Sequence, residues 1–231
     1  NGAGKTTLLR LAAGLLTPKT GHVAFNNPSA DFNRPDLRAL HIGYLPQDNV
    51  AAWPVRVYDL VALGGLASET WADGELASIR QNQSVLKALE LCDAAHLSAR
   101  AITALSGGEQ ARVFLARLLA TEADILLLDE PVKMLDPAHQ LKTMGLLVRL
   151  AEAGRAVVVV MHDLNLALRY CDNVVLMRAG MVDAQGAPQD VFTQDRLQRI
   201  FGLDVSLVAH QGHRLVHPLR ASEVGHEPDT N

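Results

Sequence analysis

The sequence is poor in cysteine and carries no excess of positive charge. Its two cysteines, Cys92 and Cys171, lie far apart and form no Cys-x-x-Cys pair, which excludes a disulfide framework and a cysteine-based zinc site. We expect both to be small apolar side chains in a reducing environment. Acidic residues outnumber basic ones by 25 to 21, for a formal net charge of −4. This balance argues against a general nucleic-acid-binding protein, because such binding needs a basic surface.

Long hydrophobic runs are also missing. The longest, such as residues 156–161, fall far short of the roughly 20 residues of a membrane-spanning helix, and we recognise no signal peptide. We therefore expect a soluble protein that can still dock on a membrane protein. The 231 residues are 48% hydrophobic and 20% charged, which suffices for a sizeable core and disfavours a disordered chain.

Two apolar runs predict buried strands. Residues 125–128 and 156–161 are apolar throughout, and a helical pattern over 138–153 separates them. Such strands, apolar on both faces and alternating with helices, are typical of a parallel α/β sheet. The other expected elements are strands at 22–25, 42–45, 173–178 and 181–184, helical segments at 8–15, 55–97, 109–120 and 189–201, a loop at 26–36 and a flexible tail over 221–231. The helical pattern over 55–97 is interrupted by the Gly64-Gly65 pair and by a polar stretch at 68–74.

The first residues resemble part of a phosphate-binding loop. The string Gly2-x-Gly4-Lys5-Thr6 precedes a helical pattern, and glycines allow backbone N–H groups to close around a phosphate at a helix N-terminus. Lys5 would reach the β- and γ-phosphates, and the Thr6 hydroxyl would bind Mg²⁺. The alternative is an ordinary glycine turn.

An acidic pair follows the apolar run at 125–128. Asp129 and Glu130 are expected at the carboxyl edge of the sheet, where α/β folds bind nucleotides. Asp129 would bind Mg²⁺, and Glu130 would orient and polarise an attacking water. The alternative is an acidic pair that only caps a turn.

Two further strings have both a functional and a structural interpretation. Leu105-Ser106-Gly107-Gly108-Glu109-Gln110 combines a hydroxyl and glycines at a helix start, which suggests a second anion site. Ser106 with Glu109 is also a capping box. His162 follows a predicted strand parallel to the one that ends at Asp129, while the adjacent Asp163 is a candidate N-cap.

At these residues the chain resembles the nucleotide-binding subunit of an ABC transporter. Six motifs occur in the family's order over most of the chain, from residue 1 to about 219. They are Walker A at 1–7, the Q-loop Gln47, the signature motif at 105–110, Walker B at 125–129 with Glu130 following, the D-loop Asp136 and the switch His162. The implied fold is a P-loop α/β ATPase core with a mainly parallel sheet and a helical subdomain at 48–100, which in this family receives the permease.

The resemblance also implies how the motifs act. Two subunits would dimerise head to tail with two ATP molecules between them. Walker A residues Asn1, Gly2, Gly4, Lys5, Thr6 and Thr7 would bind the phosphates, and Ser106, Gly107 and Gly108 would reach the γ-phosphate bound by the partner, near Asp136. Mg²⁺ would be held by Thr6, Gln47 and Asp129. Glu130, His162 and Gln47 would serve hydrolysis, with Glu130 as the base.

A finer resemblance concerns the transported compound. The strings at 44–47, 161–167 and 191–202 look like those of importers of iron–siderophore, haem or cobalamin complexes. The implied partners are a second ATPase subunit, an integral-membrane permease and, indirectly, a substrate-binding protein, at the cytoplasmic face of the plasma membrane. His210, His213 and His217 suggest a metal or haem site, or else surface or strand positions.

Two departures from the family pattern stand out. Lys133 lies where small residues are common, next to the expected dimer seam, where it would pair with an acidic group or have no measurable effect. The chain also begins inside Walker A, so we expect it to be truncated at its N-terminus, without the family's β-rich leader and adenine-stacking aromatic residue. The alternatives are a non-transport ABC ATPase, which usually carries a coiled-coil insertion or a second cassette, and an inactive fragment of an importer subunit.

Overall fold

The computed structural model describes residues 2–24, 34–67, 75–210 and 213–221. The chain divides into two compact units. We call residues 6–161 the sheet unit, and residues 1–5 together with 162–231 the hairpin unit.

The sheet unit is built on three parallel strands. They are β1 (Ile42–Leu45), β2 (Ile125–Asp129) and β3 (Ala156–Val160), in the order β1-β2-β3. Ile125 pairs with Ile42 on one side and with Ala156 on the other, so all three strands start in register, and β1 ends one residue before β2 and β3. The predicted parallel α/β sheet is confirmed.

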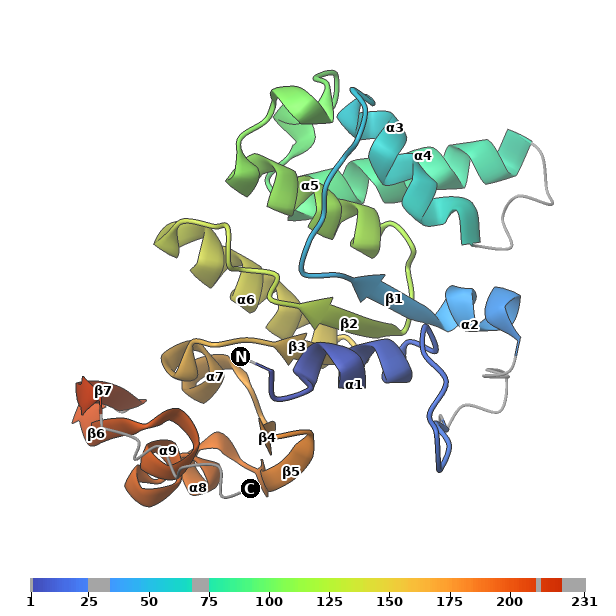
Figure 1. Cartoon of the computed structure of the whole chain (residues 1–231). Helices are drawn as coiled ribbons and strands as arrows, with labels where there is room; N and C mark the ends of the chain where they lie inside the picture. Colours follow the sequence, from blue (N-terminus) through green and yellow to red (C-terminus); the bar gives the residue numbers. More distant parts are fainter. Residues whose placement is uncertain (1, 25–33, 68–74, 211–212, 222–231) are drawn as a thin grey trace. The chain divides into compact units, whose positions relative to one another are not determined.

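Helices cover both faces of this sheet (Figure 1). On one face, Leu9 and Ala13, in and just after α1 (Lys5–Ala12), pack on Leu127 and Val160. On the other face, Leu118 of α5 (Gly107–Leu119) lies against Gly43 and Leu126, where a Cβ on Gly43 would come within 2.6 Å of the Leu118 side chain. Neighbouring residues of β2 therefore face opposite helices, which explains why the strand is apolar throughout. The unit also contains α2 (Pro35–His41) and α6 (Pro137–Glu152).

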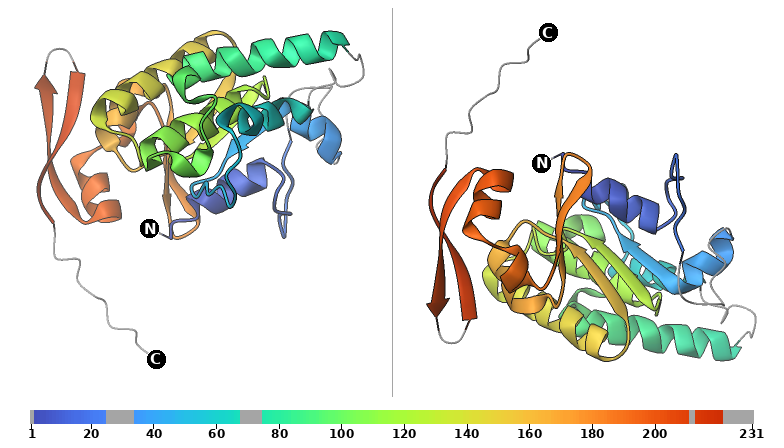
Figure 2. Two further views of the ribbon diagram at one scale, coloured as in Figure 1. Left: turned by 90° about the horizontal axis from the view of Figure 1, so that it is seen from above. Right: turned by 90° about the horizontal axis from the view of Figure 1, so that it is seen from below.

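The segment predicted to be helical over 55–97 forms several helices that pack on α5 (Figure 2). It contains α3 (Val57–Ala62), η1 (Leu63–Ala67), α4 (Glu75–Leu91) and η3 (Ala95–Leu97), and η4 (Ile102–Ala104) follows. Val57, Val61, Val85 and Leu89 are completely or almost completely buried there. The Gly64-Gly65 pair lies in η1, which follows α3 directly, and the polar stretch at 68–74 lies outside the described residues.

In its described residues, the hairpin unit contains two antiparallel hairpins and three short helices. The first hairpin pairs β4 (Val174–Arg178) with β5 (Met181–Gly186), and the second pairs β6 (Leu203–His210) with β7 (His213–Ala221; Figure 2). The helices are α7 (Leu164–Tyr170), α8 (Pro188–Val191) and α9 (Gln194–Phe201).

One prediction in this unit is wrong. The expected single helix at 189–201 is interrupted, because the side chain of Phe192 is buried and Thr193 caps a new helix. The Thr193 hydroxyl accepts a hydrogen bond from the Arg196 N–H at 3.3 Å, and Gly202 ends the helix with a φ of 62°. Phe192 is the C-cap of α8 and the adjacent Thr193 is the N-cap of α9, so the segment forms two helices rather than one.

Other predictions differ at the edges of the described ranges. His22–Ala24 form no strand, because no described strand pairs with them, and Phe25 lies outside the described residues. The expected loop at 26–36 falls mostly outside as well, and Pro35 already begins α2. β7 continues to Ala221, and the remainder of the expected tail lies outside the described residues. The prediction of strand positions is confirmed for three histidines, His210, His213 and His217.

Both cysteines are free thiols, as the sequence predicted. Burial raises the pKa of the Cys92 thiol to about 12, so it stays protonated and behaves as an apolar side chain. Among the helices in the described part of the chain, none combines the length and the apolar character needed to cross a membrane.

Candidate functional site

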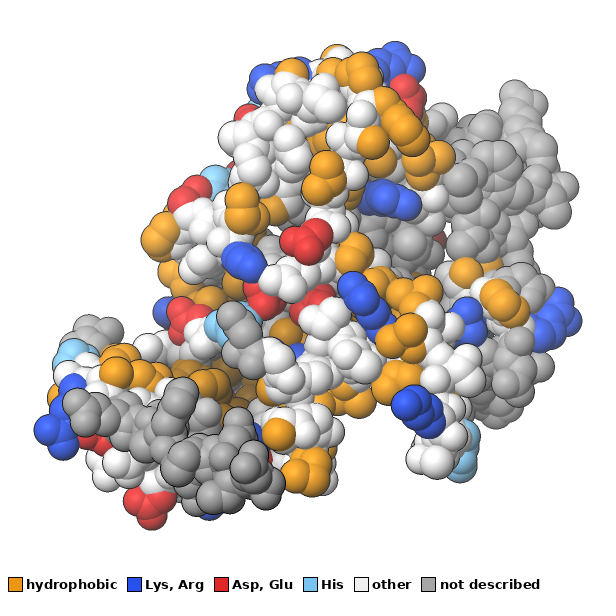
Figure 3. Space-filling model, in the orientation of Figure 1, with side chains coloured by type: hydrophobic (Ala, Val, Ile, Leu, Met, Phe, Trp, Pro, Cys, Tyr) orange, Lys and Arg blue, Asp and Glu red, His pale blue; other side chains and the backbone are white. Residues whose placement is uncertain are grey.

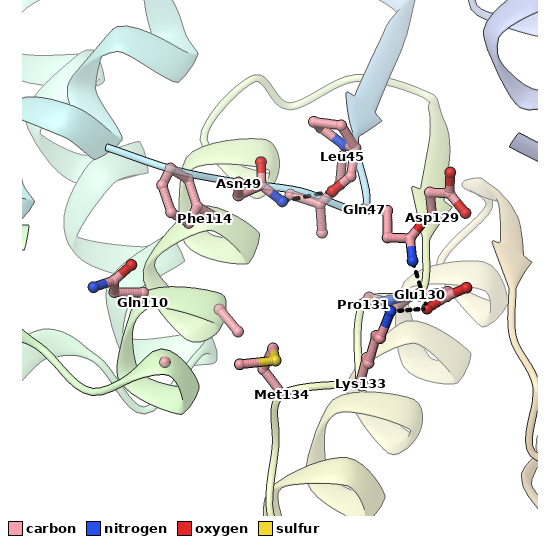
Figure 4. A pocket seen from close by; sticks show the side chains of 13 residues that line it. Leu45, Gln47, Asn49, Gln110, Phe114, Asp129, Glu130, Pro131, Lys133 and Met134 are labelled. Carbon is pink, nitrogen blue, oxygen red and sulfur yellow. Dashed lines mark hydrogen bonds and ion pairs between the residues drawn. The ribbon is translucent and has the colours of Figure 1, made fainter. Parts of the chain in front are cut away.

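Two of the predicted catalytic residues, Gln47 and Glu130, meet at the carboxyl edge of the parallel sheet. β2 ends at Asp129, with Glu130 directly after it, and Gln47 follows the end of β1. The Gln47 side-chain amide donates to Glu130 Oε2 at 3.1 Å (Figure 4). Because parallel strands end at the same edge, residues 83 positions apart come into contact there.

The Asp129 carboxylate is buried without a hydrogen-bond partner. Its exposed fraction is 1%, and neither Oδ1 nor Oδ2 accepts a hydrogen bond from any described residue. A buried, unpaired carboxylate is costly, and a divalent cation is the kind of partner that compensates it. The described residues contain no group of three or more acidic, His or Cys side chains that could by itself hold a metal ion. Asp129 therefore fits Mg²⁺, which is commonly held by one or two carboxylates together with substrate phosphates.

Glu130 adopts a backbone conformation that is unusual for its residue type. Its φ is +53°, in the left-handed region, which costs a non-glycine residue about 1–2 kcal/mol. Two backbone hydrogen bonds hold it there. Its N–H donates to Val160 O at 3.0 Å, and its carbonyl accepts from the Lys133 N–H at 3.2 Å. This tight turn fixes the direction in which the Glu130 side chain leaves the strand.

The Glu130 carboxylate has a second donor, which lies on the turn that follows β2. Lys133 Nζ lies 3.1 Å from Glu130 Oε2, the oxygen that also accepts from Gln47 (Figure 4). In the space-filling view, basic and acidic side chains lie side by side beyond the end of β2 (Figure 3). The expectation that Lys133 pairs with an acidic group agrees with this contact.

These side chains line a pocket of about 110 Å³. Its lining residues come from the ends of β1 and β2, the turn that follows β2 and the first turns of α5: Leu45, Pro46, Gln47, Asn49, Gly107, Gln110, Ala111, Phe114, Asp129, Glu130, Pro131, Lys133 and Met134. The sequence did not single out Asn49 or Phe114. Phe114 follows Gln110 by one helical turn, and this spacing is the only signal that could have indicated it.

The signature string forms a capping box. Ser106 is the N-cap of α5, with its hydroxyl accepting from the Glu109 N–H at 3.3 Å and its own N–H donating to Glu109 Oε2 at 2.8 Å. The backbone hydrogen bond from Ser106 is the largest cause that lowers the pKa of Glu109. A Cβ on Gly108 would lie 3.2 Å from Met134 O, so the glycines let α5 begin against the turn that follows β2.

Asp136 caps the next helix. Its carboxylate accepts from the His139 N–H at 3.0 Å and contacts His139 Nδ1 at 2.7 Å, and the backbone hydrogen bond is the largest cause that lowers the pKa of Asp136. His139 Nε2 in turn lies 3.6 Å from Asp93, which also accepts from Lys142 at 3.3 Å. The sequence did not indicate this network, because Asp93 is distant along the chain.

The phosphate-loop residues bend as a glycine loop requires. Gly2 and Gly4 have φ values of +79° and +88°, and α1 begins at Lys5, with Thr6 and Thr7 in its first turn. No acidic side chain lies in that turn, so the positive end of the helix dipole is not neutralised locally. The carbonyl of Ala3 accepts from the Gly180 N–H at 3.2 Å. Asn1 lies outside the described residues.

The segment after β3 has structural roles that explain part of its sequence. His162 follows the strand, and Asp163 caps α7 by accepting from the N–H groups of Asn165 and Leu166 at 2.8 and 3.0 Å. Asn165 exchanges two side-chain hydrogen bonds with the backbone of Val216 in β7, at 3.1 and 2.8 Å. The string that suggested a substrate group therefore also holds the C-terminal hairpin.

The sheet unit thus brings Gln47, Asp129 and Glu130 together with Gly107 around one pocket. Ser106 and Asp136 lie at helix starts and are not among the lining residues. Gly2, Gly4, Lys5 and His162 belong to the hairpin unit.

Comparison with known proteins agrees with this site. The ABC transporter family matches residues 1–133. The chain is 41% identical over 224 residues to a hemin import ATP-binding protein of Pseudomonas putida, covering 94% of this chain and 85% of that protein. It is also 41% identical over 223 residues to a hemin import ATP-binding protein of Rhizobium meliloti, covering 92% and 82%.

Solved structures give the same result. The fold is similar to a metal-chelate type ABC transporter in an inward-facing conformation, with a TM-score of 0.78 and 27% identity over 95% of this chain and 83% of that one. It is also similar to a dimeric bacterial ABC transporter cassette, with a TM-score of 0.70 and 27% identity over 81% and 82%. The family match, the relatives and the arrangement at the sheet edge show that the chain belongs to the ABC transporter family, as an ATP-binding subunit of the ATPase type.

Proposed function

We propose that this chain hydrolyses ATP to drive the import of haem through a membrane permease. The observation that best supports the ATPase role is that Gln47, Asp129 and Glu130 lie together at one edge of the sheet, with Asp129 buried and without a hydrogen-bond partner. The choice of haem is supported by the two relatives, at 41% identity, that are named for hemin import. The structural similarity to a metal-chelate type transporter is consistent with that choice.

In this proposal the start of α1 binds the phosphates of ATP. Gly2 and Gly4 allow the backbone N–H groups to turn toward an anion, and Lys5 adds a positive charge. Thr6 and Asp129 would hold Mg²⁺, with Gln47 nearby, and Asn1 and Thr7 complete the loop. The bound cation would neutralise phosphate charge during the transfer.

Glu130 acts as the base of hydrolysis. Its carboxylate orients the attacking water and accepts its proton, while Gln47 holds the carboxylate and His162 contacts the γ-phosphate. The side chain of Glu130 is only 9% exposed, which keeps bulk water from competing for it.

A second subunit and a permease complete the assembly. Ser106, Gly107 and Gly108 would reach the γ-phosphate in the partner, and Asp136 would lie at the shared seam. The helical subdomain at 48–100 would receive the permease, which agrees with the exposure of Val50 and Trp53, at 85% and 68%. This assembly would place the chain at the cytoplasmic face of the plasma membrane, with a substrate-binding protein on the other side.

Reconstitution tests the transported compound. The full-length subunit is assembled with its permease in liposomes, and ATP hydrolysis is measured with binding protein loaded with hemin, a ferric siderophore or cobalamin. Hemin should stimulate hydrolysis most strongly. Stimulation by another compound alone would refute haem as the substrate, and an ATPase that never co-purifies with a permease would indicate a non-transport role.

A further inference from the structure

Lys133 is close to Glu130 both in sequence and in space. It follows Glu130 by three positions, on the turn that the Lys133 N–H closes onto the Glu130 carbonyl. Its Nζ lies 3.1 Å from Glu130 Oε2, and its own side chain is 55% exposed while that of Glu130 is 9% exposed. The lysine therefore reaches from the surface to a carboxylate that water barely contacts.

Two donors from different elements meet on one oxygen. Gln47 follows β1, Lys133 follows β2, and both contact Glu130 Oε2 at 3.1 Å. In Figure 4 the second carboxylate oxygen points away from both donors. Both contacts are charge-assisted because their acceptor is an ionised carboxylate, and Lys133 adds a full positive charge that Gln47 lacks.

We propose that Lys133 is a positioning residue for ATP hydrolysis. With Gln47 it fixes Oε2 of Glu130, so that the carboxylate presents its second oxygen to the attacking water. Lys133 itself touches neither ATP nor the water. This inference rests on the proposed function, because it assigns a support to the base of that reaction.

Steady-state kinetics of the full-length chain with its permease test the role. Lys133→Met keeps the length of the side chain and removes its charge, Lys133→Arg keeps the charge, and Lys19→Met removes an exposed lysine outside the pocket. Lys133→Met should lower kcat about two- to fivefold, the effect of an ion pair of about 0.4–1 kcal/mol, with KM for ATP unchanged. Lys133→Arg should retain most of kcat, and Lys19→Met all of it.

Other kinetic outcomes overturn the proposal. An unchanged or raised kcat in Lys133→Met means that the lysine does not support Glu130. A changed KM with unchanged kcat means that it acts on nucleotide binding instead. If the wild-type assembly does not hydrolyse ATP, the proposed function fails and the positioning role fails with it. Hydrolysis that persists unchanged in Lys133→Met refutes the positioning role alone.

A double-mutant cycle tests the contact without turnover. The free energy of unfolding of the nucleotide-free chain is measured by urea titration for Lys133→Met, Glu130→Gln and the double variant. Residues in contact are expected to be non-additive, so the double variant should lose less stability than the sum of the single losses. Strict additivity would mean that the two side chains do not interact, and the proposal would be wrong.

Discussion

Gly64 is the position where one added methyl group should destabilise the fold most clearly. It lies buried in η1, and a Cβ placed on it would come within 2.1 Å of the Arg117 carbonyl oxygen and 3.3 Å of the Ala120 Cβ. Both obstacles belong to α5 or its C-cap, and the nearer one is backbone. To relieve this clash, η1 and α5 must move apart by about 1 Å. Overpacking typically costs about 1–3 kcal/mol of stability. Because the obstacle is helix backbone, we expect Gly64→Ala to lose about 2–3 kcal/mol.

Gly145 supplies the matched control. It lies inside α6 with an ordinary φ, and its Cβ would make only an ordinary contact, at 3.7 Å from the Arg149 guanidinium. Alanine in such a helix interior gains about 0.5–1 kcal/mol over glycine. The same substitution is thus expected to have opposite signs at the two positions.

Urea unfolding followed by circular dichroism measures both effects. With an m-value of about 3 kcal/mol/M, the two variants should differ in midpoint by about 1 M. The two m-values should agree, which shows that the midpoints report stability. A Gly64→Ala variant as stable as the wild type would refute the close packing of η1 on α5, and with it the described support of the helix that carries the signature string.

Two further predictions concern carboxylates. Asp129→Asn should weaken binding of ATP by about tenfold or more when Mg²⁺ is present and leave binding in EDTA unchanged, as measured by isothermal titration calorimetry. In the same variant the nucleotide-free chain should become more stable, because an unpaired buried charge is removed. The side-chain hydrogen bond from Lys142 is the largest cause that lowers the pKa of Asp93. The backbone hydrogen bond from His139 is the largest cause that lowers the pKa of Asp136. These two carboxylates therefore stabilise the fold fully at pH values above the ordinary aspartate pKa. The stabilisation is lost as the pH falls below about 4 toward their lowered pKa values. An unfolding free energy that does not decrease from about pH 5 to pH 3 would contradict this sign.

The parallel sheet could be predicted because its strands are apolar on both faces. β1 and β2 start and end within one residue of the predicted ranges, since a buried strand next to a polar turn has a clear boundary. The break between α8 and α9 was missed, because it depends on where Phe192 is buried, and burial by distant residues leaves no local signal.

The site residues likewise divide into those that local sequence patterns indicated and those that they did not. Local patterns indicated Glu130 and the Ser106 capping box, because strand-end and helix-start chemistry is written in adjacent residues. Only the family resemblance indicated Gln47, and its contact with Glu130, 83 positions away, was not predicted. The approach of His139 to Asp93 had no signal of either kind.

The central claim, that Glu130 is the base of ATP hydrolysis, is tested most directly by Glu130→Gln. In the full-length subunit assembled with its permease, ATP turnover and Mg²⁺-dependent ATP binding are measured on the same preparation. We expect turnover to fall by about a hundredfold or more, the effect of losing a general base, while ATP still binds. Turnover within a few-fold of the wild type would contradict the account.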